Sequence, residues 1–405
     1  MNSQKVFTKD FILGASVNFL LMLCYFIPMM VMTLYVTESL GGSIGEGGLA
    51  AGLFVIGALI SRMSCGKWMN ITGRWNLLFY GSLVCFGSVL LYFISSNLYV
   101  LYAVRLIHGI AYGASATAVG TMVAGMIPAE RRGEGLGYYL LSITLASAVG
   151  PFIGMFIIAH GGFNMIFSVC VATTALSVVG VVFMSRDNEV LVAEKQPAAE
   201  TRGGLSAYFE FAALPISFVC LVMYFCYSGV MAFITPFAKQ QGLTTAASMF
   251  FVVYSVVILV SRPYTGRLFD TKGENVSMYP SFVAVAAGMC ILGASKGAVG
   301  VLTSAALIGF GFGVVQSCGL AIAVKLTPPD RLALANSTFY AFVDAGVGMG
   351  PLILGLVIPA TGYKGMYYLL AVISLLCLFL YYFTHGRNAG QPQIAEEPIP
   401  QYKAV

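Results

Sequence analysis

The sequence predicts an all-α membrane protein with twelve transmembrane helices, arranged as two six-helix parallel repeats. Three observations lead to this prediction. The 405-residue chain is 59% hydrophobic and only 9% charged, with a mean hydropathy of +0.87, whereas soluble domains carry about 25% charged residues. Twelve apolar runs are long enough to span a bilayer, which takes about 20 residues each. Short motifs also recur at an offset of 200 residues.

The predicted spans form two sets of six. In chain order they cover 11–36, 47–66, 76–95, 98–126, 134–158 and 163–184, then 211–237, 244–266, 276–295, 298–326, 331–357 and 363–384. They define a first half over 1–185 and a second half over 211–386. The polar segment 186–210 is predicted to be a linker between the halves, and the polar tail 387–405 is predicted to be disordered.

Basic residues are distributed unequally between the two sides of the predicted bundle. Seventeen of the 21 Lys and Arg residues fall on the side of the amino terminus, and three (Lys239, Lys296 and Lys364) fall on the opposite side. Cytoplasmic loops carry the excess of Lys and Arg, so both termini and the linker are predicted to be cytoplasmic in a multi-pass protein of the inner (cytoplasmic) membrane. No basic patch predicts nucleic-acid binding.

A glycine-rich, basic stretch occurs twice, each time after an apolar run. Residues 61–73 read SRMSCGKWMNITG, and residues 261–273 read SRPYTGRLFDTKG. Two further pairs share the offset: PAERR at 128–132 with PPDRL at 328–332, and GPFIG at 150–154 with GPLILG at 350–355. The halves are therefore expected to be parallel repeats, as in one large class of transporters. The stretch itself is predicted to form the tight turn between the second and third helices of each half.

This stretch resembles the G-x-L-x-D-R-x-G-R turn of the major facilitator superfamily. The matching residues are Gly66, Lys67, Asn70, Gly73 and Arg74 in the first copy, and Gly266, Arg267, Asp270 and Gly273 in the second. The resemblance implies that the acid faces the positive end of a neighbouring helix and latches the cytoplasmic side between conformations. Asn70 replaces the acid in the first copy, so Asp270 is predicted to be the stronger latch. Alternatively, both turns only shape the loop.

A second resemblance lies in VRLIHGIAYGA at 104–114, which is similar to the fourth-helix motif of the same superfamily through Arg105, Gly109 and Gly113. Arg105 is the only base predicted to lie well inside a span, and the resemblance implies that it takes part in proton coupling. Alternatively, its side chain extends to the outer surface. His108 lies on the same helix face, as a proton relay or as a packing residue.

The segment ASAVGPFIG at 146–154 resembles the fifth-helix motif of proton-driven efflux members. Its residues are Gly150, Pro151 and Gly154, and Gly350 and Pro351 repeat the motif in the predicted eleventh helix. The resemblance implies export by proton antiport. Close packing of small residues, or the duplication itself, is the alternative explanation.

Asp344, in FYAFVDAGVGMG, is the only one of the sixteen acidic residues predicted near the middle of a span. A charge at that depth costs about 2.5–3.5 kcal/mol on insertion scales, so it should face a cavity or a partner. Asp344 is predicted to carry the coupling proton or to provide the counter-charge of the substrate. Alternatively, it caps a helix broken at Gly346, Gly348 or Gly350. Whether Arg105 and Asp344 meet is left open.

Further polar and aromatic side chains are predicted to line a substrate cavity together with Arg105 and Asp344. They are Asn18, Tyr25, Tyr224, Tyr227 and Gln316. One central acid among aromatic rings suits an amphipathic or cationic organic solute, which charge and cation–π contacts would hold.

The motifs of several enzyme classes are absent, namely G-x-x-x-x-G-K-[ST], H-E-x-x-H and G-x-S-x-G in a strand–turn–helix unit. The nine cysteines stand singly, without the spacing of a metal site. We therefore expect a protein that is not an enzyme and that has no cofactor and no metal. An ion gradient, rather than ATP, would drive it.

The function predicted from the sequence is proton-coupled export of a small molecule by alternating access, carried out by a monomer in the lipid bilayer. Three alternatives remain. The first is narrow-specificity export of an endogenous metabolite, such as an opine-type metallophore. The second is proton-coupled import, and the third is a membrane receptor that transports nothing.

Overall fold

A computed structural model describes residues 7–127, 132–186, 209–328 and 331–389. These residues form helices and contain no strand. Eleven helices are long and apolar enough to cross a membrane. The last of them, α12, contains a break at Gly362 and provides two spans. The predicted all-α membrane fold is therefore confirmed. Most of the predicted linker (187–208) and of the predicted tail (390–405) lies outside the described residues.

The long helices follow one another with short connections. Their bounds are α1 Lys9–Ser39, α2 Ile44–Thr72, α3 Arg74–Leu91, α4 Leu98–Met126, α5 Arg132–His160, α6 Phe163–Val182, α8 Leu214–Gln241, α9 Thr244–Lys272, α10 Glu274–Ala294, α11 Ala298–Lys325 and α12 Leu332–Thr384. Three short 3₁₀ helices accompany them: η1 Tyr92–Ile94, η4 Phe211–Ala213 and η6 Gly386–Asn388.

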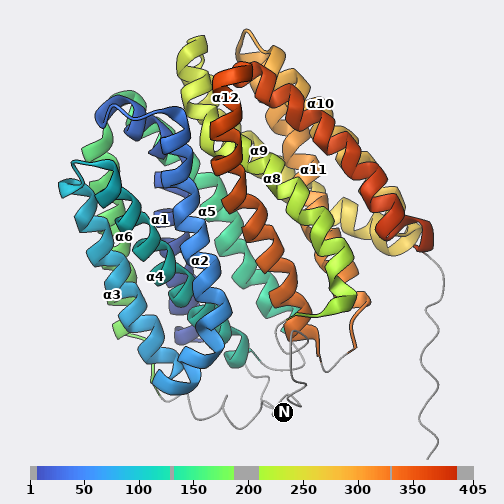
Figure 1. The fold of residues 1–405 in the computed structure, drawn as a ribbon. Helices are drawn as coiled ribbons and strands as arrows, with labels where there is room; N and C mark the ends of the chain where they lie inside the picture. Colours follow the sequence, from blue (N-terminus) through green and yellow to red (C-terminus); the bar gives the residue numbers. More distant parts are fainter. Residues whose placement is uncertain (1–6, 128–131, 187–208, 329–330, 390–405) are drawn as a thin grey trace, which may run out of the picture.

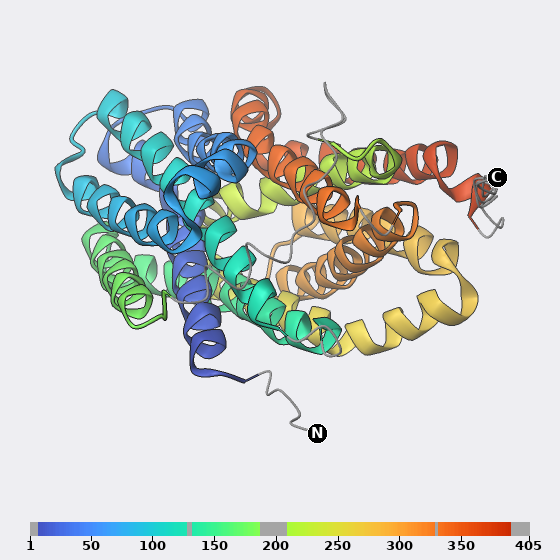
Figure 2. The ribbon, with the colours of Figure 1, turned by 90° about the horizontal axis from the view of Figure 1, so that it is seen from below.

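The helices pack as two bundles that lie side by side (Figures 1 and 2). Helices α1 to α6 form the amino-terminal bundle, in which α2 packs on α4 and α1 packs on α5 and α6. Helices α8 to α12 form the carboxy-terminal bundle, in which α12 packs on α8 and α10 packs on α11. Between the bundles, α2 packs on α12, α5 on α9 and α1 on α8.

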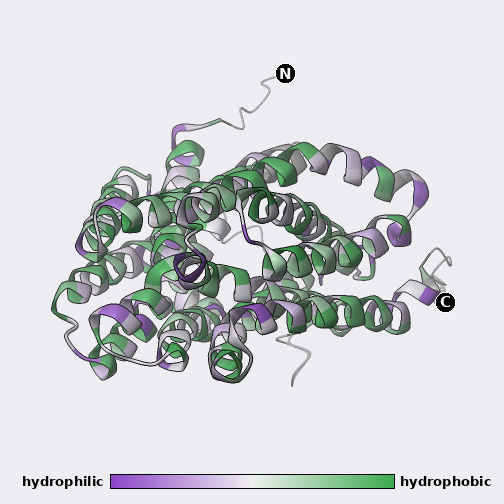
Figure 3. Ribbon diagram, turned by 90° about the horizontal axis from the view of Figure 1, so that it is seen from above, coloured by the Kyte–Doolittle hydropathy of each residue, from purple (hydrophilic) through white to green (hydrophobic). Residues whose placement is uncertain are grey.

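The outer faces of the helices are apolar. Figure 3 shows hydrophobic residues along most helical segments, with hydrophilic residues concentrated near helix ends and loops. Large exposed side chains include Leu83, Leu141, Phe156, Val260 and Phe379. A helix that is hydrophobic on all sides belongs in a membrane or a large core, so these exposed faces are suited to contact lipid.

Six glycines with positive φ end helices or join them. They occur as three pairs: Gly41 (65°) with Gly242 (68°), Gly73 (81°) with Gly273 (87°), and Gly162 (82°) with Gly362 (67°). Glycine adopts this left-handed region without steric cost. Two pairs are separated by 200 residues and one by 201, so both bundles use the same turns, in agreement with an internal duplication.

The repeated stretch is helical over most of its length. Helix α2 continues to Thr72 and α9 to Lys272, so Gly66, Lys67, Gly266 and Arg267 lie inside helices. The prediction of a tight turn over the whole stretch was wrong. A single glycine, Gly73 or Gly273, reverses the chain, and α3 or α10 begins at the next residue, which is Arg74 in the first copy. The side chains of Lys67, Asn70 and Asp270 lie outside the described part, so the latch stays a prediction.

The helices of both bundles run between two ends of the molecule, the terminal end and the distal end. The terminal end contains the starts of α1, α5, α8 and α12, and the distal end contains the turns at Gly41, Gly162, Gly242 and Gly362. The orientation of these ends in the membrane remains the prediction made from the basic residues.

Candidate functional site

An ion pair joins the two bundles at the predicted coupling residue. Asp344 on α12 places Oδ2 3.0 Å from Nε of Arg62 on α2, and the two side chains remain 20% and 26% exposed. Arg105 is not the only arginine within the spans, because the α2 span Ile44–Cys65 contains Arg62 near its end and the α9 span Thr244–Arg262 ends at Arg262. Asp344 therefore has a cationic partner from the opposite bundle.

The contact between Arg62 and Asp344 is electrostatic and poorly aligned. Arg62 Nε and Asp344 Oδ2 are both buried atoms without a hydrogen bond of acceptable geometry, although they lie 3.0 Å apart. A desolvated ion pair recovers its desolvation cost only with good geometry and further hydrogen bonds. This pair is consequently weaker than its short distance suggests.

The internal repeat places an equivalent contact, which lacks the carboxylate, on the other side of the interface. Arg262 on α9 follows Arg62 by 200 residues, and Thr144 on α5 precedes Asp344 by the same number. Nη1 of Arg262 lies 3.5 Å from Oγ1 of Thr144, and Nη2 lies 3.5 Å from Oε1 of Gln316 on α11. Thr144 of the amino-terminal half therefore provides a hydroxyl group at the position where Asp344 of the carboxy-terminal half provides a carboxylate.

These contacts share one layer of the molecule. Arg62, Arg262 and Gln316 each lie 18 residues after the distal start of their helix, which corresponds to about 27 Å at 1.5 Å per residue. Asp344 and Thr144 each lie twelve residues after the terminal start of theirs. The predicted residues Gln316 and Asp344 are thus brought to the same depth.

An amino-terminal aromatic cluster consists of Tyr25, Phe54 and Tyr112. The ring centroid of Tyr25 lies 5.3 Å from that of Phe54 and 5.5 Å from that of Tyr112, in stacked geometry. Tyr25 is also close enough to Asp344 to interact with it electrostatically. The predicted cavity residue Tyr25 therefore lies near the ion pair.

A carboxy-terminal aromatic cluster consists of Tyr224, Tyr227, Tyr254 and Phe312. Tyr227 stacks on Tyr254 at 5.5 Å and packs on Phe312 at 4.9 Å, while Tyr224 packs on Phe312 at 5.6 Å. Tyr254 and Phe312 occupy the positions that Phe54 and Tyr112 hold in the first half. Both bundles thus present an aromatic cluster, and Tyr224 and Tyr254 lie within electrostatic range of Arg262.

Asn18 lies inside the amino-terminal bundle. Its Nδ2 donates a 2.9 Å hydrogen bond to Oγ of Ser142 on α5, and its Oδ1 is buried without a partner. The side chain is 1% exposed. Two turns separate it from Tyr25 on α1, so it joins α1 to α5 toward the terminal end.

Arg105 is fully buried within the amino-terminal bundle, away from Asp344. It donates to the carbonyl groups of Ala50 (2.9 Å) and Ala51 (3.3 Å) and to the hydroxyl of Tyr92 (3.2 Å). Its guanidinium lies 4.6 Å from the ring centroid of Phe54. Its depth along the helix axis differs from that of Asp344 by about 17 Å. Arg105 and Asp344 do not pair in this structure, and the side chain of Arg105 does not reach the outer surface.

His108 belongs to the same buried group as Arg105. Its Nδ1 lies 2.8 Å from the hydroxyl of Tyr92, and its Nε2 lies 3.6 Å from Sγ of Cys24. Tyr92 thereby connects His108 to Arg105. These polar contacts hold α1, η1, α2 and α4 together, and a role in proton transfer stays a prediction.

The glycines of the resembled motifs permit close helix packing. A Cβ atom at Gly109 would lie 1.9 Å from the carbonyl oxygen of Phe54, between α4 and α2. Gly150 brings α5 against Phe26 of α1, and Gly350 brings α12 against Ser228 of α8. The carbonyl of Pro351 meets Gly48 of α2 across the bundle interface, where an added Cβ would lie 2.2 Å away. Gly113, Gly154 and Pro151 lie on the same helices.

The bundles are held together toward the distal end. Thr235 on α8 donates a 2.7 Å hydrogen bond to the carbonyl of Met30 on α1, and Lys239 forms an ion pair with Glu38 near the turns. Within the described residues, every polar contact between the bundles lies either in the layer of Arg62 and Arg262 or nearer the distal end.

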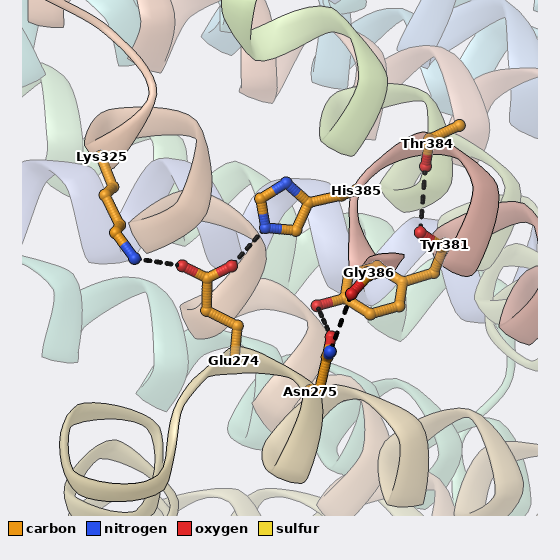
Figure 4. A network of polar contacts seen from close by, with 7 residues as sticks. All are labelled: Glu274, Asn275, Lys325, Tyr381, Thr384, His385 and Gly386. Carbon is orange, nitrogen blue, oxygen red and sulfur yellow. Dashed lines mark hydrogen bonds and ion pairs between the residues drawn. The ribbon is translucent and has the colours of Figure 1, made fainter. Parts of the chain in front are cut away.

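A separate polar network closes the terminal end of the carboxy-terminal bundle (Figure 4). Glu274, the first residue of α10, accepts a 2.7 Å hydrogen bond from Lys325 at the end of α11 and also contacts His385 beyond α12. Asn275 donates to the carbonyl of Gly386 and accepts from the hydroxyl of Tyr381. The sequence prediction missed this network. Glu274 in the first turn of a predicted helix is the one available signal.

The described residues contain no group of three or more His, Cys, Asp or Glu side chains placed to hold a metal ion. The arrangement can instead exchange an inter-bundle salt bridge for a proton or a charged solute. Two bundles related by internal repeat, with a charged layer between them, define a membrane transporter architecture.

Comparison with known proteins identifies the family. The family model described as Major Facilitator Superfamily matches residues 14–331 and 278–404. The chain therefore belongs to the major facilitator superfamily and is a transporter of that class. The sequence-based family assignment is confirmed.

Individual relatives and structures agree with this assignment. The chain is 24% identical over 352 residues to an uncharacterised MFS-type transporter of Methanocaldococcus jannaschii, covering 85% of this chain and 90% of that protein. It is 22% identical over 315 residues to multidrug resistance protein 2 of Bacillus subtilis, covering 76% and 75%. A crystal structure of a POT family transporter in complex with a thioalcohol-conjugated peptide has a TM-score of 0.76 at 12% identity, covering 93% and 96%. This last likeness concerns the fold alone.

Proposed function

We propose that the protein exports a small amphipathic or cationic organic solute in exchange for protons, by alternating access of a central site. The observation that carries the proposal is the ion pair between Arg62 and Asp344, which links the two bundles near Tyr25 of the amino-terminal aromatic cluster. The name of the Bacillus subtilis relative, a multidrug resistance protein, supports the direction of transport.

Asp344 is the residue that would exchange the proton. In its charged form it is held by Arg62, and the pair ties α12 to α2. When a carboxylate oxygen binds a proton, the charge of Asp344 is neutralised and the attraction to Arg62 is lost. A cationic group of the solute could satisfy the deprotonated carboxylate in place of Arg62. Proton and solute would therefore compete for one side chain, which is the requirement of an antiporter.

The position of the remaining contacts supports one step of such a cycle. The bundles meet through Thr235 and Met30, through Glu38 and Lys239, and through Gly48 and Pro351, all toward the distal end. If the termini are cytoplasmic, as the basic residues predict, this conformation is closed to the outside. Opening the distal end would require these contacts to separate while the terminal ends approach.

The test is proton release from acidified everted vesicles that contain the full-length protein, followed with a pH dye while a panel of lipophilic cations is added. The parent should release protons when a transported cation is present. Asp344→Asn should insert in the membrane normally but release none, because the side chain can no longer bind and lose a proton. Lys272→Gln, at an exposed position of α9 outside the central layer, is the control and should release protons like the parent. Uphill transport by Asp344→Asn at the parent rate would exclude the proposed role.

The narrow-specificity export of an endogenous metabolite is a second candidate, and one observation favours it. Arg262 contributes a second positive charge to the central layer, which a site built only for cations would not need.

A further inference from the structure

The charges of the central layer do not balance. Arg62 faces Asp344 at 3.0 Å, so this cation and this anion compensate each other. Arg262 has only neutral partners among the described residues, the hydroxyl of Thr144 and the amide oxygen of Gln316, both at 3.5 Å. The layer therefore carries one positive charge that no described carboxylate neutralises.

The guanidinium of Arg262 also has unused hydrogen-bonding capacity. Its Nε is buried and has no partner, and contacts of 3.5 Å are at the long limit for a hydrogen bond. Arginine presents five donors in a planar fork that matches the two oxygens of a carboxylate. An unpaired charge at membrane depth is costly and commonly marks a substrate or ion pathway.

The surroundings of Arg262 provide further groups for an anionic ligand. The amide of Gln316 accepts from Arg262 through its oxygen, and its NH₂ group is a further donor for an anionic ligand. The hydroxyls of Tyr224, Tyr254 and Tyr340 lie within electrostatic range of the guanidinium. On the same face of α9, seven residues before Arg262, Ser255 has a buried hydroxyl without a partner.

A purely structural role does not account for this arrangement. The amino-terminal half shows how the fold pairs an arginine at this position with an acid across the interface. At the equivalent contact, Arg262 of the carboxy-terminal half faces Thr144 of the amino-terminal half, which can support the guanidinium but cannot neutralise it. The contact of Arg262 therefore lacks the acid that the contact of Arg62 has, although both contain the cation.

We infer that Arg262 binds an anionic group of the transported solute, so that the substrates are small organic carboxylates with an apolar body, zwitterions included. The aromatic clusters on either side would hold the apolar body. Tyr340 lies within electrostatic range of Arg262, Arg62 and Asp344, so a zwitterion could place its carboxylate at Arg262 and its cationic group at Asp344. This inference rests on the proposed transport function and selects, among the amphipathic solutes, those that carry a carboxylate.

The experiment measures ligand-induced thermal stabilisation of the purified full-length protein in detergent. Four probes share one phenylpropyl body: 3-phenylpropionate, 3-phenylpropylamine, 3-phenylpropan-1-ol and the zwitterion phenylalanine. In the parent, the acid or the zwitterion should raise the melting temperature more than the alcohol does. Arg262→Gln should lower the apparent affinity for that probe about tenfold or more, the loss expected for a charge-assisted contact. Arg262→Lys keeps the positive charge but not the planar fork of donors. Its apparent affinity should lie between those of the parent and Arg262→Gln.

The control variant is Lys272→Gln, which removes one positive charge from an exposed position on the same helix and should bind like the parent. If Arg262→Gln does not fold, the comparison of Arg262→Lys with the parent decides. The inference is overturned if the acid and the zwitterion stabilise the parent no more than the alcohol does. It is equally overturned if the Arg262 variants bind them like the parent.

The binding measurement needs no proton gradient, so its outcome is separate from that of the vesicle experiment. Carboxylate binding that depends on Arg262, together with normal coupling by Asp344→Asn, would retain the substrate class and reject the coupling residue. The reverse combination would retain the coupling residue and reject the substrate class.

Discussion

At the scale of single residues, the charge state of Asp344 depends on its neighbour Arg62. A lone acid in a membrane span would have to stay neutral or face water, whereas an acid beside a cation can remain charged. The equivalent pair on the other side of the interface, Thr144 with Arg262, has no carboxylate to hold a proton in this way. The two contacts are equivalent by the internal repeat but differ in chemistry, because only the first contains a carboxylate that can bind and release a proton.

The pair between Arg62 and Asp344 can be measured by a double-mutant cycle. We expect Arg62→Gln and Asp344→Asn each to lower the melting temperature, and the double variant to lose less than the sum, because the second change removes a charge that the first has already left unpaired. Coupling energies of neighbouring residues are about 0.5–3 kcal/mol. Additive losses would show that the 3.0 Å contact contributes nothing to stability. Thr144→Val combined with Asp344→Asn provides the uncoupled reference.

At the scale of helices, the terminal ends of α10, α11 and α12 depend on Glu274. This carboxylate is almost fully buried, while its partner Lys325 is largely exposed. Exposed ion pairs contribute about 0–1 kcal/mol, so most of the contribution should come from the buried contact with His385. The equivalent place in the amino-terminal bundle is built differently, with Trp75 donating to the carbonyl of Met184 and stacked under Arg186.

We expect Glu274→Gln to lower the melting temperature clearly and Lys325→Gln to change it little. The glutamine keeps the size of the side chain but removes the charge that faces Lys325 and His385. Thermal unfolding of the two variants in detergent measures the difference. Equal losses in both would mean that the exposed lysine, and not the buried histidine contact, dominates the network.

At the scale of the whole molecule, we expect a single added methyl group to shift the balance between conformations that are closed and open at the distal end. The chain of α2 approaches α12 so closely at Gly48 that an added Cβ would lie 2.2 Å from the carbonyl oxygen of Pro351. Neither backbone can yield without moving the bundles apart. Gly48→Ala should therefore favour the conformation that is open at the distal end.

This shift can be followed by oxidative cross-linking between cysteines that replace Glu38 and Lys239, the ion pair of the distal turns. Cross-linking should be slower in Gly48→Ala than in the parent pair. The control is Gly87→Ala, because nothing lies within 4 Å of an added Cβ at that position. An unchanged cross-linking rate in Gly48→Ala would show that the close approach is not part of the distal closure.

The sequence predicted correctly those features that depend on the order of residues along the chain. Apolar runs predicted the spans, and the 200-residue offset predicted related halves, whose shared glycine turns the structure contains. The length of α2 was underestimated because the basic residues at its end looked like a loop, although one left-handed glycine suffices for the turn. The central site was predicted in part. Of the predicted residues, Gln316 and Asp344 contact the arginines of the charged layer, and Tyr25 lies near Asp344. Arg62 and Arg262 themselves were not predicted there, because they lie at the ends of apolar runs and resemble the basic residues of a loop.

By itself, the sequence determined that this protein lies in a membrane, belongs to the major facilitator superfamily and carries one acid deep in a span. These conclusions depend on hydropathy, motif spacing and repetition, which are properties of the order of residues. Only the tertiary structure decided which charges meet. Arg62 and Asp344 come from different bundles and are 282 positions apart, so their contact depends on how α2 packs on α12. Arg105, which the motifs indicated, is instead held by hydrogen bonds to backbone carbonyls and a tyrosine inside one bundle.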